Sequence, residues 1–253
     1  MRSGGPIMIK KRTILVAAVI WLSLCTSLFA EEKDDRNWKD EAELSYVDTS
    51  GNTDILSLSA KNKLNLNFTD RLSGQWDISA LYAKTDGEKT AERYATSGRL
   101  DYSITEQIYA AGIAGWMKDE FSGIERRFNI GPAFGYKFLL GPKHFLKAEA
   151  GLEYVDENYT NDDEASFVQG RIFGQYEFLL TEKSKFSQSL EYLHDFDDGS
   201  DYTVNSVSAI ITSLSDTYSI KTSYEVHYDH EPVPDDLDKT DTILSVALVV
   251  NFN

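Results

Sequence analysis

The chain has 253 residues, a mean hydropathy of −0.36 and a formal net charge of −16. This hydropathy argues against a bundle of membrane-spanning helices, and the acidic balance argues against a nucleic-acid partner, because phosphate binding needs a basic face. The single cysteine, Cys25, excludes an intramolecular disulfide and a cysteine-rich metal centre.

The first thirty residues have the pattern of a secretory signal peptide. Three basic residues at 10–12 precede an apolar run over 14–29, which ends at Ala30 and is too short for a membrane-spanning helix. We therefore predict a signal peptide over residues 1–30. Its removal would take away Cys25 and four basic residues and move the net charge to about −20. A lipoprotein signal ending at Cys25 is a weaker alternative, because the residue before it is a bulky leucine.

Beyond this segment, apolar and polar side chains alternate with period two. Over residues 56–68 one parity is mostly leucine, and the other carries serine, lysine and asparagine. Period two indicates β-strands, and strands of about ten residues behind a secretory signal favour an outer-membrane barrel. We predict an all-β fold, a transmembrane antiparallel up-and-down β-barrel of about 12 strands over residues 40–253, with a short periplasmic segment at 31–39. The predicted strands cover 40–48, 55–68, 72–84, 92–103, 107–118, 127–139, 144–156, 166–179, 185–196, 202–213, 218–228 and 241–252.

The predicted connections alternate between short and long. Short turns are expected at 69–71, 105–106, 141–143, 181–183 and 215–217. Longer charged loops are expected at 85–91, 119–126, 156–165, 197–201 and 229–240. This asymmetry is typical of outer-membrane barrels and predicts that both chain ends lie on the short-turn, periplasmic side.

Aromatic residues recur on the apolar parity near the predicted strand ends, where membrane–water interfaces place them. A soluble β-sandwich or ligand-binding barrel with these rings inside is the alternative, because alternation alone does not say which face is wet. The apolar last strand, which ends in Phe252, favours the membrane.

If the apolar parity faces lipid, the polar parity faces the lumen, and it carries both signs of charge. One interpretation is a network of ion pairs that closes the lumen, and the other is a narrow hydrated pore. Barrels of about eight strands are filled by side chains, and barrels of sixteen or more leave an aqueous channel. About twelve strands fall between these sizes, so both interpretations remain. The charged residues predicted to face the lumen are Lys61, Lys63, Arg93, Arg99, Asp101, Lys137, Lys147, Glu149, Arg171, Glu177, Glu191, Lys221 and Glu225.

Carboxylates are concentrated at 161–164, 195–201 and 235–238, where oxygen ligands could bind calcium or magnesium. None of these segments has the spacing of an EF-hand, so solvated loops are the favoured interpretation, and we predict no metal site and no cofactor.

Catalysis is a third hypothesis, in the form of a lipid-acting enzyme with a Ser–His pair on the lipid-facing surface. His194 falls on that surface, and the predicted hairpin register places Val204 opposite it and Ser206 one step diagonal. No G-x-S-x-G elbow is present, and we predict that the protein is not an enzyme.

Four local sequences carry a family resemblance. They are Ser50-Gly51-Asn52-Thr53, Glu92-Arg93-Tyr94-Ala95 with Gly98-Arg99, Gly141-Pro142 before His144, and Glu231-Pro232-x-Pro234. With these stretches the chain resembles the YdiY-like salt-induced outer-membrane protein family, a family built on a domain of unknown function. The resemblance implies an outer-membrane barrel that responds to osmotic, salt or acid stress, and it supplies no substrate or catalytic residues.

Together these observations predict a narrow outer-membrane channel for small polar solutes or ions. A closed structural barrel for envelope integrity or surface contact is the alternative. The expected partners are outer-membrane lipids, lipopolysaccharide and, during biogenesis, the barrel-assembly machinery, with no nucleic acid and a monomeric state.

Overall fold

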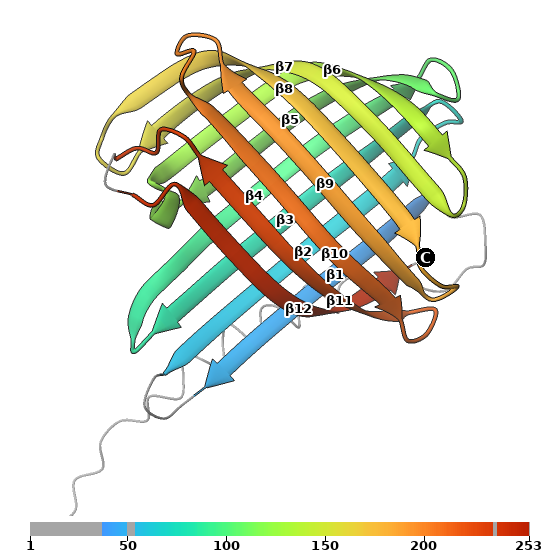
Figure 1. The fold of residues 1–253 in the computed structure, drawn as a ribbon, viewed down its shortest axis with the longest axis horizontal. Helices are drawn as coiled ribbons and strands as arrows, with labels where there is room; N and C mark the ends of the chain where they lie inside the picture. The colour runs from blue at the N-terminus through green and yellow to red at the C-terminus, as the bar shows by residue number, and fades with distance from the viewer. Residues whose placement is uncertain (1–36, 50–53, 235–236, 253) are drawn as a thin grey trace, which may run out of the picture. The chain divides into compact units, whose positions relative to one another are not determined.

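A computed structural model gives the fold of residues 37–49, 54–234 and 237–252 (Figure 1). Among these residues the chain forms twelve strands and one short 3-10 helix, η2 (Glu120–Ser122). The strands are β1 (Trp38–Thr49), β2 (Ile55–Asn67), β3 (Leu72–Thr85), β4 (Glu88–Ser103), β5 (Ile108–Asp119), β6 (Ile124–Leu140), β7 (His144–Tyr159), β8 (Glu164–Leu179), β9 (Ser184–Asp195), β10 (Tyr202–Ser213), β11 (Tyr218–Asp229) and β12 (Thr240–Phe252). No described helix is long and apolar enough to cross a membrane.

The sheet is closed. Each strand pairs antiparallel with the next, and β1 also pairs with β12, from Asp40 opposite Phe252 to Leu44 opposite Leu248 (Figure 1). Closure leaves no strand edge with unpaired backbone groups, which a sheet in lipid requires. The predicted fold class, an antiparallel barrel of about twelve strands, is confirmed.

The strands begin and end within four residues of the predicted limits. β1 begins at Trp38, so the predicted segment 31–39 extends too far and its last two residues belong to the barrel. The predicted signal peptide and the Ser50–Thr53 motif lie outside the described residues.

Three connections are shorter than predicted. The loop expected over 85–91 is a two-residue turn, Asp86–Gly87, whose positive φ angles of 52° and 86° suit a tight hairpin. The loops expected over 119–126 and 156–165 shrink to four residues each. In each case strand pairing continues into polar residues, which a hydrated rim tolerates. A clear length difference between the two ends therefore remains mainly at the β9–β10 and β11–β12 connections.

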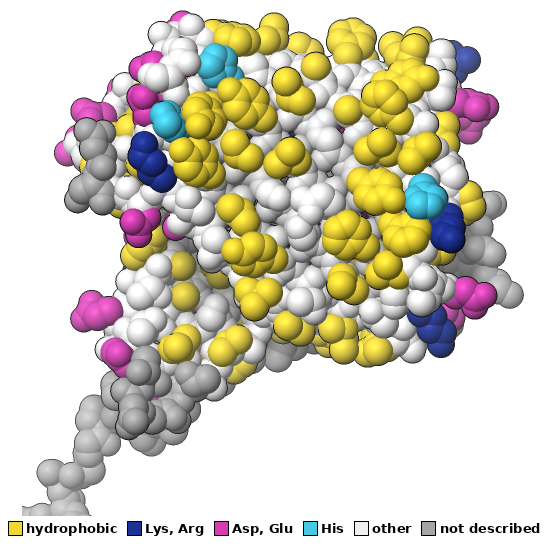
Figure 2. Space-filling view, viewed as in Figure 1, with side chains coloured by type: hydrophobic (Ala, Val, Ile, Leu, Met, Phe, Trp, Pro, Cys, Tyr) yellow, Lys and Arg dark blue, Asp and Glu magenta, His cyan; other side chains and the backbone are white. Residues whose placement is uncertain are grey.

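The outer wall of the barrel is apolar. On the face shown in Figure 2, hydrophobic and uncharged side chains cover the middle, and charged side chains gather toward the two ends. Large side chains are exposed along the whole wall, among them Phe134 at 66% and Leu244 at 73%. Such a surface would be unstable in water and matches the apolar band of a membrane barrel.

Inside the barrel, the wall made by β5 to β8 is densely packed. Gly135 on β6 allows the Tyr109 ring to lie against the backbone, because a Cβ at this position would sit 2.1 Å from Tyr109 Cζ. Buried apolar side chains point inward here; they are Tyr109, Ala111, Ile124, Ala133, Val155 and Phe167. The free volume of the lumen therefore lies beside this wall.

Candidate functional site

A cavity of about 1220 Å³ occupies the lumen. Its lining reaches from Asp238 and Asp241 at the loop end to Glu182 and Lys183 at the short-turn end. A 12-residue strand with a rise of about 3.3 Å per residue and a tilt of roughly 40° gives a barrel height on the order of 30 Å. The mean cross-section of this free volume is therefore roughly 40 Å².

Glu149 on β7 is the centre of the lumen's charge network. Its side chain is fully buried and accepts hydrogen bonds from the Arg99 guanidinium at 2.8 Å, Arg171 at 3.0 Å, Lys147 at 3.1 Å and the Tyr109 hydroxyl at 2.7 Å. One carboxylate thus holds three cations from β4, β7 and β8. Because a buried charge is costly unless paired and hydrogen-bonded, these contacts fix the side chains against the packed wall.

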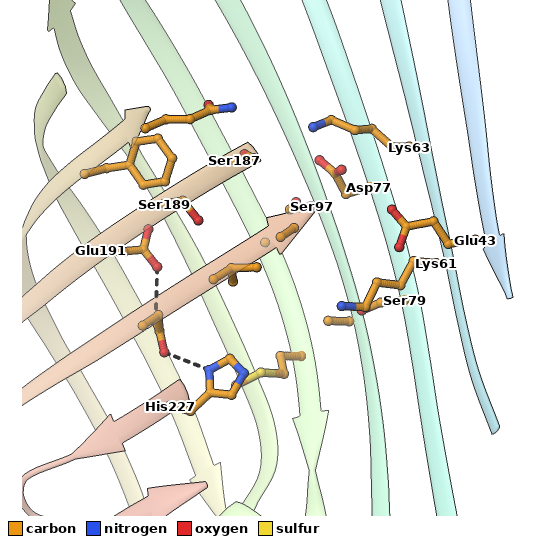
Figure 3. A pocket seen from close by; sticks show the side chains of 18 of the residues that line it. Glu43, Lys61, Lys63, Asp77, Ser79, Ser97, Ser187, Ser189, Glu191 and His227 are labelled. Carbon is orange, nitrogen blue, oxygen red and sulfur yellow. Dashed lines mark hydrogen bonds between the residues drawn. The ribbon is translucent and has the colours of Figure 1, made fainter. Parts of the chain in front are cut away.

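A second set of contacts continues across the lumen. Arg171 Nε donates to Glu191 at 2.6 Å. Glu191 also accepts from the Asn205 amide at 3.1 Å, which is the dashed line that ends at Glu191 in Figure 3. The Asn205 oxygen lies 2.9 Å from His227 Nδ1, and His227 Nε2 lies 3.3 Å from the Arg93 guanidinium. A neutral imidazole protonated at Nδ1 satisfies both contacts, because it donates to Asn205 and accepts from Arg93.

Two ion pairs bridge strands on either side of the closing seam. Lys61 on β2 pairs with Glu225 on β11, and Lys221 on β11 pairs with Glu43 on β1 at 2.7 Å. Both pairs join strands that are not neighbours, so they tie the first strands of the chain to the last across the seam.

Small neutral side chains line the open part of the cavity. Ser79 and Ser97 face it from β3 and β4, and Ser187 and Ser189 from β9 (Figure 3). These hydroxyls leave space that a larger side chain would fill. Hydroxyl groups thus face the cavity from β3 and β4 on one side and from β9 on the other.

The predicted lumen residues divide into two groups. Nine line the cavity: Lys61, Lys63, Arg93, Arg99, Lys147, Arg171, Glu177, Glu191 and Lys221. The other four lie beside the lining. Three are carboxylates that pair with lining cations: Asp101 with Arg99, Glu149 with Arg99 and Arg171, and Glu225 with Lys61. The fourth is Lys137, whose ammonium lies 5.4 Å from the Tyr109 ring centre.

Sequence reasoning missed Tyr109 and Asn205, which connect the charged groups. Both sit on the parity that faces inward, but most other residues of that parity in β5 and β10 are small or apolar, so alternation gave little signal there. It named the acidic segment 195–201 but missed the cluster that Asp201 forms with residues of other strands at the loop end, where a small cavity is lined by Glu157, Asp201, Asp229 and Glu231. Arg127 is the one Lys or Arg among the described residues that line this small cavity, and it pairs with Glu157.

The pKa of Asp201 shows how the carboxylates of this cluster affect one another. Partial burial and the neighbouring carboxylates of Asp229, Asp195 and Glu231 raise its pKa to about 6, against the opposing effect of Arg127. At neutral pH the loop end therefore holds more negative charge than its basic groups balance.

Asp201→Asn is expected to stabilise the barrel at pH 7. The folded state holds the Asp201 proton more tightly than the unfolded chain, whose pKa is about 3.9. The ionised carboxylate thus costs stability above pH 6, and this cost disappears as the pH falls toward 4. After allowance for solvent screening, the gain at pH 7 should be on the order of 1 kcal/mol. Urea unfolding of both proteins in lipid vesicles at pH 7 and pH 4 would measure it, and a gain that is equal at both pH values would contradict it.

The proposed serine–histidine pair is not formed. Tyr202, not Val204, lies opposite His194, so the predicted hairpin register was wrong by two residues. Ser206 instead accepts a hydrogen bond from the Gln188 amide at 3.0 Å, and His194 lies against Tyr192. The β9–β10 connection is long enough to allow several registers, which the sequence pattern did not distinguish.

No three histidine, cysteine or carboxylate side chains of the described residues are placed to hold a metal ion. Asp235 and Asp236, part of one acidic segment, lie outside those residues.

Comparisons with known proteins agree with this architecture. The translocator domain of the autotransporter NalP from Neisseria meningitidis superposes with a TM-score of 0.55 at 10% identity, covering 96% of this chain and 97% of that one. The COG4313 outer-membrane channel from Pseudomonas putida F1 gives 0.54 at 13% identity, covering 87% and 97%. At these identities the likeness establishes the fold alone, which is that of outer-membrane barrels.

Sequence comparison identifies the family. The Escherichia coli (strain K12) uncharacterized protein YdiY is 28% identical over 203 residues, which is 80% of this chain and 79% of YdiY. The model of the protein family of unknown function DUF481 matches residues 42–252, which is nearly the whole barrel. The chain belongs to the DUF481 family.

Proposed function

We propose that the protein lies in the bacterial outer membrane and forms a narrow channel for small polar solutes or ions. The observation that carries this proposal is one cavity in the lumen whose lining reaches both ends of the barrel. The apolar outer wall supports a position in lipid, and the hydroxyl and charged lining supports passage of hydrated solutes.

Liposome swelling tests this proposal. Vesicles that contain the folded protein should swell quickly in an isotonic solution of a small solute such as glycine, and much more slowly in one of a trisaccharide, because the mean cross-section is only roughly 40 Å². Equal swelling of empty and protein-containing vesicles in every solute would contradict a channel.

A closed structural barrel for envelope integrity or surface contact is the second candidate, and the Glu149 network favours it. Three cations held by one buried carboxylate make a rigid block against the β5–β8 wall. Alanine variants of Lys61, Arg99 and Arg171 separate the candidates. In a channel they change the rate or ion preference of passage, whereas in a closed barrel they only lower stability.

The proposal includes a link to osmotic, salt or acid stress. Its support is the resemblance to a salt-induced family, and the pH-sensitive Asp201 at the loop end is consistent with it. The lipid, lipopolysaccharide and assembly-machinery partners and the monomeric state belong to the same proposal.

A further inference from the structure

The connections at the two ends of the barrel differ sharply in charge. Among the described residues, the connections at the loop end carry ten acidic residues and one basic residue, Lys239. Those at the short-turn end carry four acidic and three basic residues. Nearly all of the net negative charge of these connections therefore lies at one mouth of the lumen.

Inside the lumen the charges are balanced. The main cavity is lined by eleven acidic residues and eleven Lys or Arg residues, and four of these carboxylates, Asp119, Asp229, Asp238 and Asp241, lie at the loop end. Behind the remaining lining, Asp101, Glu149 and Glu225 add three acidic residues that pair with cations of the lining. Most of the charged residues in the middle are paired, as in Lys221 with Glu43 and Arg171 with Glu191. Paired charges of opposite sign largely cancel at the distance of a passing ion, so the middle of the lumen has little preference for either sign.

The loop end of the lumen is different. Its carboxylates line either the main cavity or the small adjoining cavity, and we call them the acidic vestibule: Asp119, Glu157, Asp201, Asp229, Glu231, Asp238 and Asp241. Asp119 pairs with Arg93, and Glu157 pairs with Arg127. Within the described part of the chain, the remaining five have no Lys or Arg partner at ion-pair distance.

From this arrangement we infer that the channel prefers cations, and that the acidic vestibule rather than the lumen network sets the preference. The inference rests on the proposed channel function. It adds that the solutes that the channel prefers are small cations. A concave mouth lined mainly by one sign of charge raises the local concentration of counter-ions, and the narrow passage behind it forces every ion through that field.

The state of Asp201 supports this assignment. Partial burial, together with the neighbouring carboxylates of Asp229, Asp195 and Glu231, raises its pKa to about 6, so the carboxylates at this mouth repel one another. Asp229 also accepts the Glu231 backbone N–H at 3.1 Å, which fixes the start of the β11–β12 connection beside the mouth. A cation passing this point would reduce that repulsion, whereas an anion would increase it.

The test is the reversal potential of the folded protein in a planar bilayer under a potassium chloride gradient. At about 0.1 M salt the potassium-to-chloride permeability ratio should exceed about 3, and it should fall toward 1 at about 1 M, where the Debye length is only about 3 Å. The triple variant Asp201→Asn, Asp229→Asn, Glu231→Gln should conduct with a ratio at least about twofold lower than the parent at 0.1 M.

The matched control removes three charges from the same end outside both cavities: Asp162→Asn, Asp163→Asn, Glu164→Gln. It should keep the parent ratio. Current without cation preference, or an equal shift in the control variant, would overturn this inference and leave the channel intact. A folded barrel that passes no current would overturn the channel and this inference together.

Discussion

Glu149→Ala should lower the free energy of unfolding by about 3 kcal/mol, the largest loss expected from any single charge in the lumen. Removing one partner of a buried ion pair costs about 3–5 kcal/mol, because the other charge is left buried without compensation. Arg99 and Arg171 keep Asp101 and Glu191 as partners, which places the expected value at the lower end of that range. The Tyr109 hydroxyl would also lose its acceptor.

Equilibrium unfolding in urea, followed by tryptophan fluorescence in lipid vesicles, measures this loss. Glu177→Ala is the matched control, because Glu177 pairs with Lys185 where both side chains are about one-third exposed, and such a pair is worth about 1 kcal/mol or less. Equal losses in the two variants would show that the Glu149 network does not hold the barrel together.

Ser189→Trp should reduce channel conductance by roughly fivefold or more while the barrel still folds. Ser189 faces the open part of the cavity, and an indole ring there would fill much of a passage whose mean cross-section is roughly 40 Å². Single-channel current in a planar bilayer gives the conductance directly.

Leu190→Trp is the control for this substitution. Leu190 is the next residue on β9, points to the opposite face and is 52% exposed on the outer wall, where a tryptophan is well tolerated. If both variants conduct like the parent, ions do not pass beside Ser189 and the assignment of the open side of the lumen is wrong.

Period two was sufficient to predict which side chains face inward, because successive residues of a strand point to opposite faces. Lys61 and Arg99 could therefore be placed in the lumen from the sequence. Their partners could not. Arg99 meets Glu149 from a strand three positions away, and that distance depends on the stagger and curvature of the closed sheet.

The lengths of the turns and the registers of the hairpins were also only partly predictable from the sequence. The Asp86–Gly87 dipeptide is a strong hairpin signal, but the charged residues around it favoured a longer loop. At the β9–β10 connection no such signal exists, and the register of Ser206 against His194 was predicted wrongly. The acidic vestibule was missed for a related reason, since its members come from β5, β7, β11, β12 and two connections that only closure of the barrel brings together.

Single-channel recording of the folded protein in a planar bilayer tests the central claim most directly. Heat-modifiable mobility on a gel would show in parallel that the barrel is folded. We predict steady current steps. Under a potassium chloride gradient, their reversal potential should show that potassium passes more readily than chloride. A folded barrel whose current does not differ from that of the bare bilayer would contradict the channel and favour a closed, ion-paired lumen.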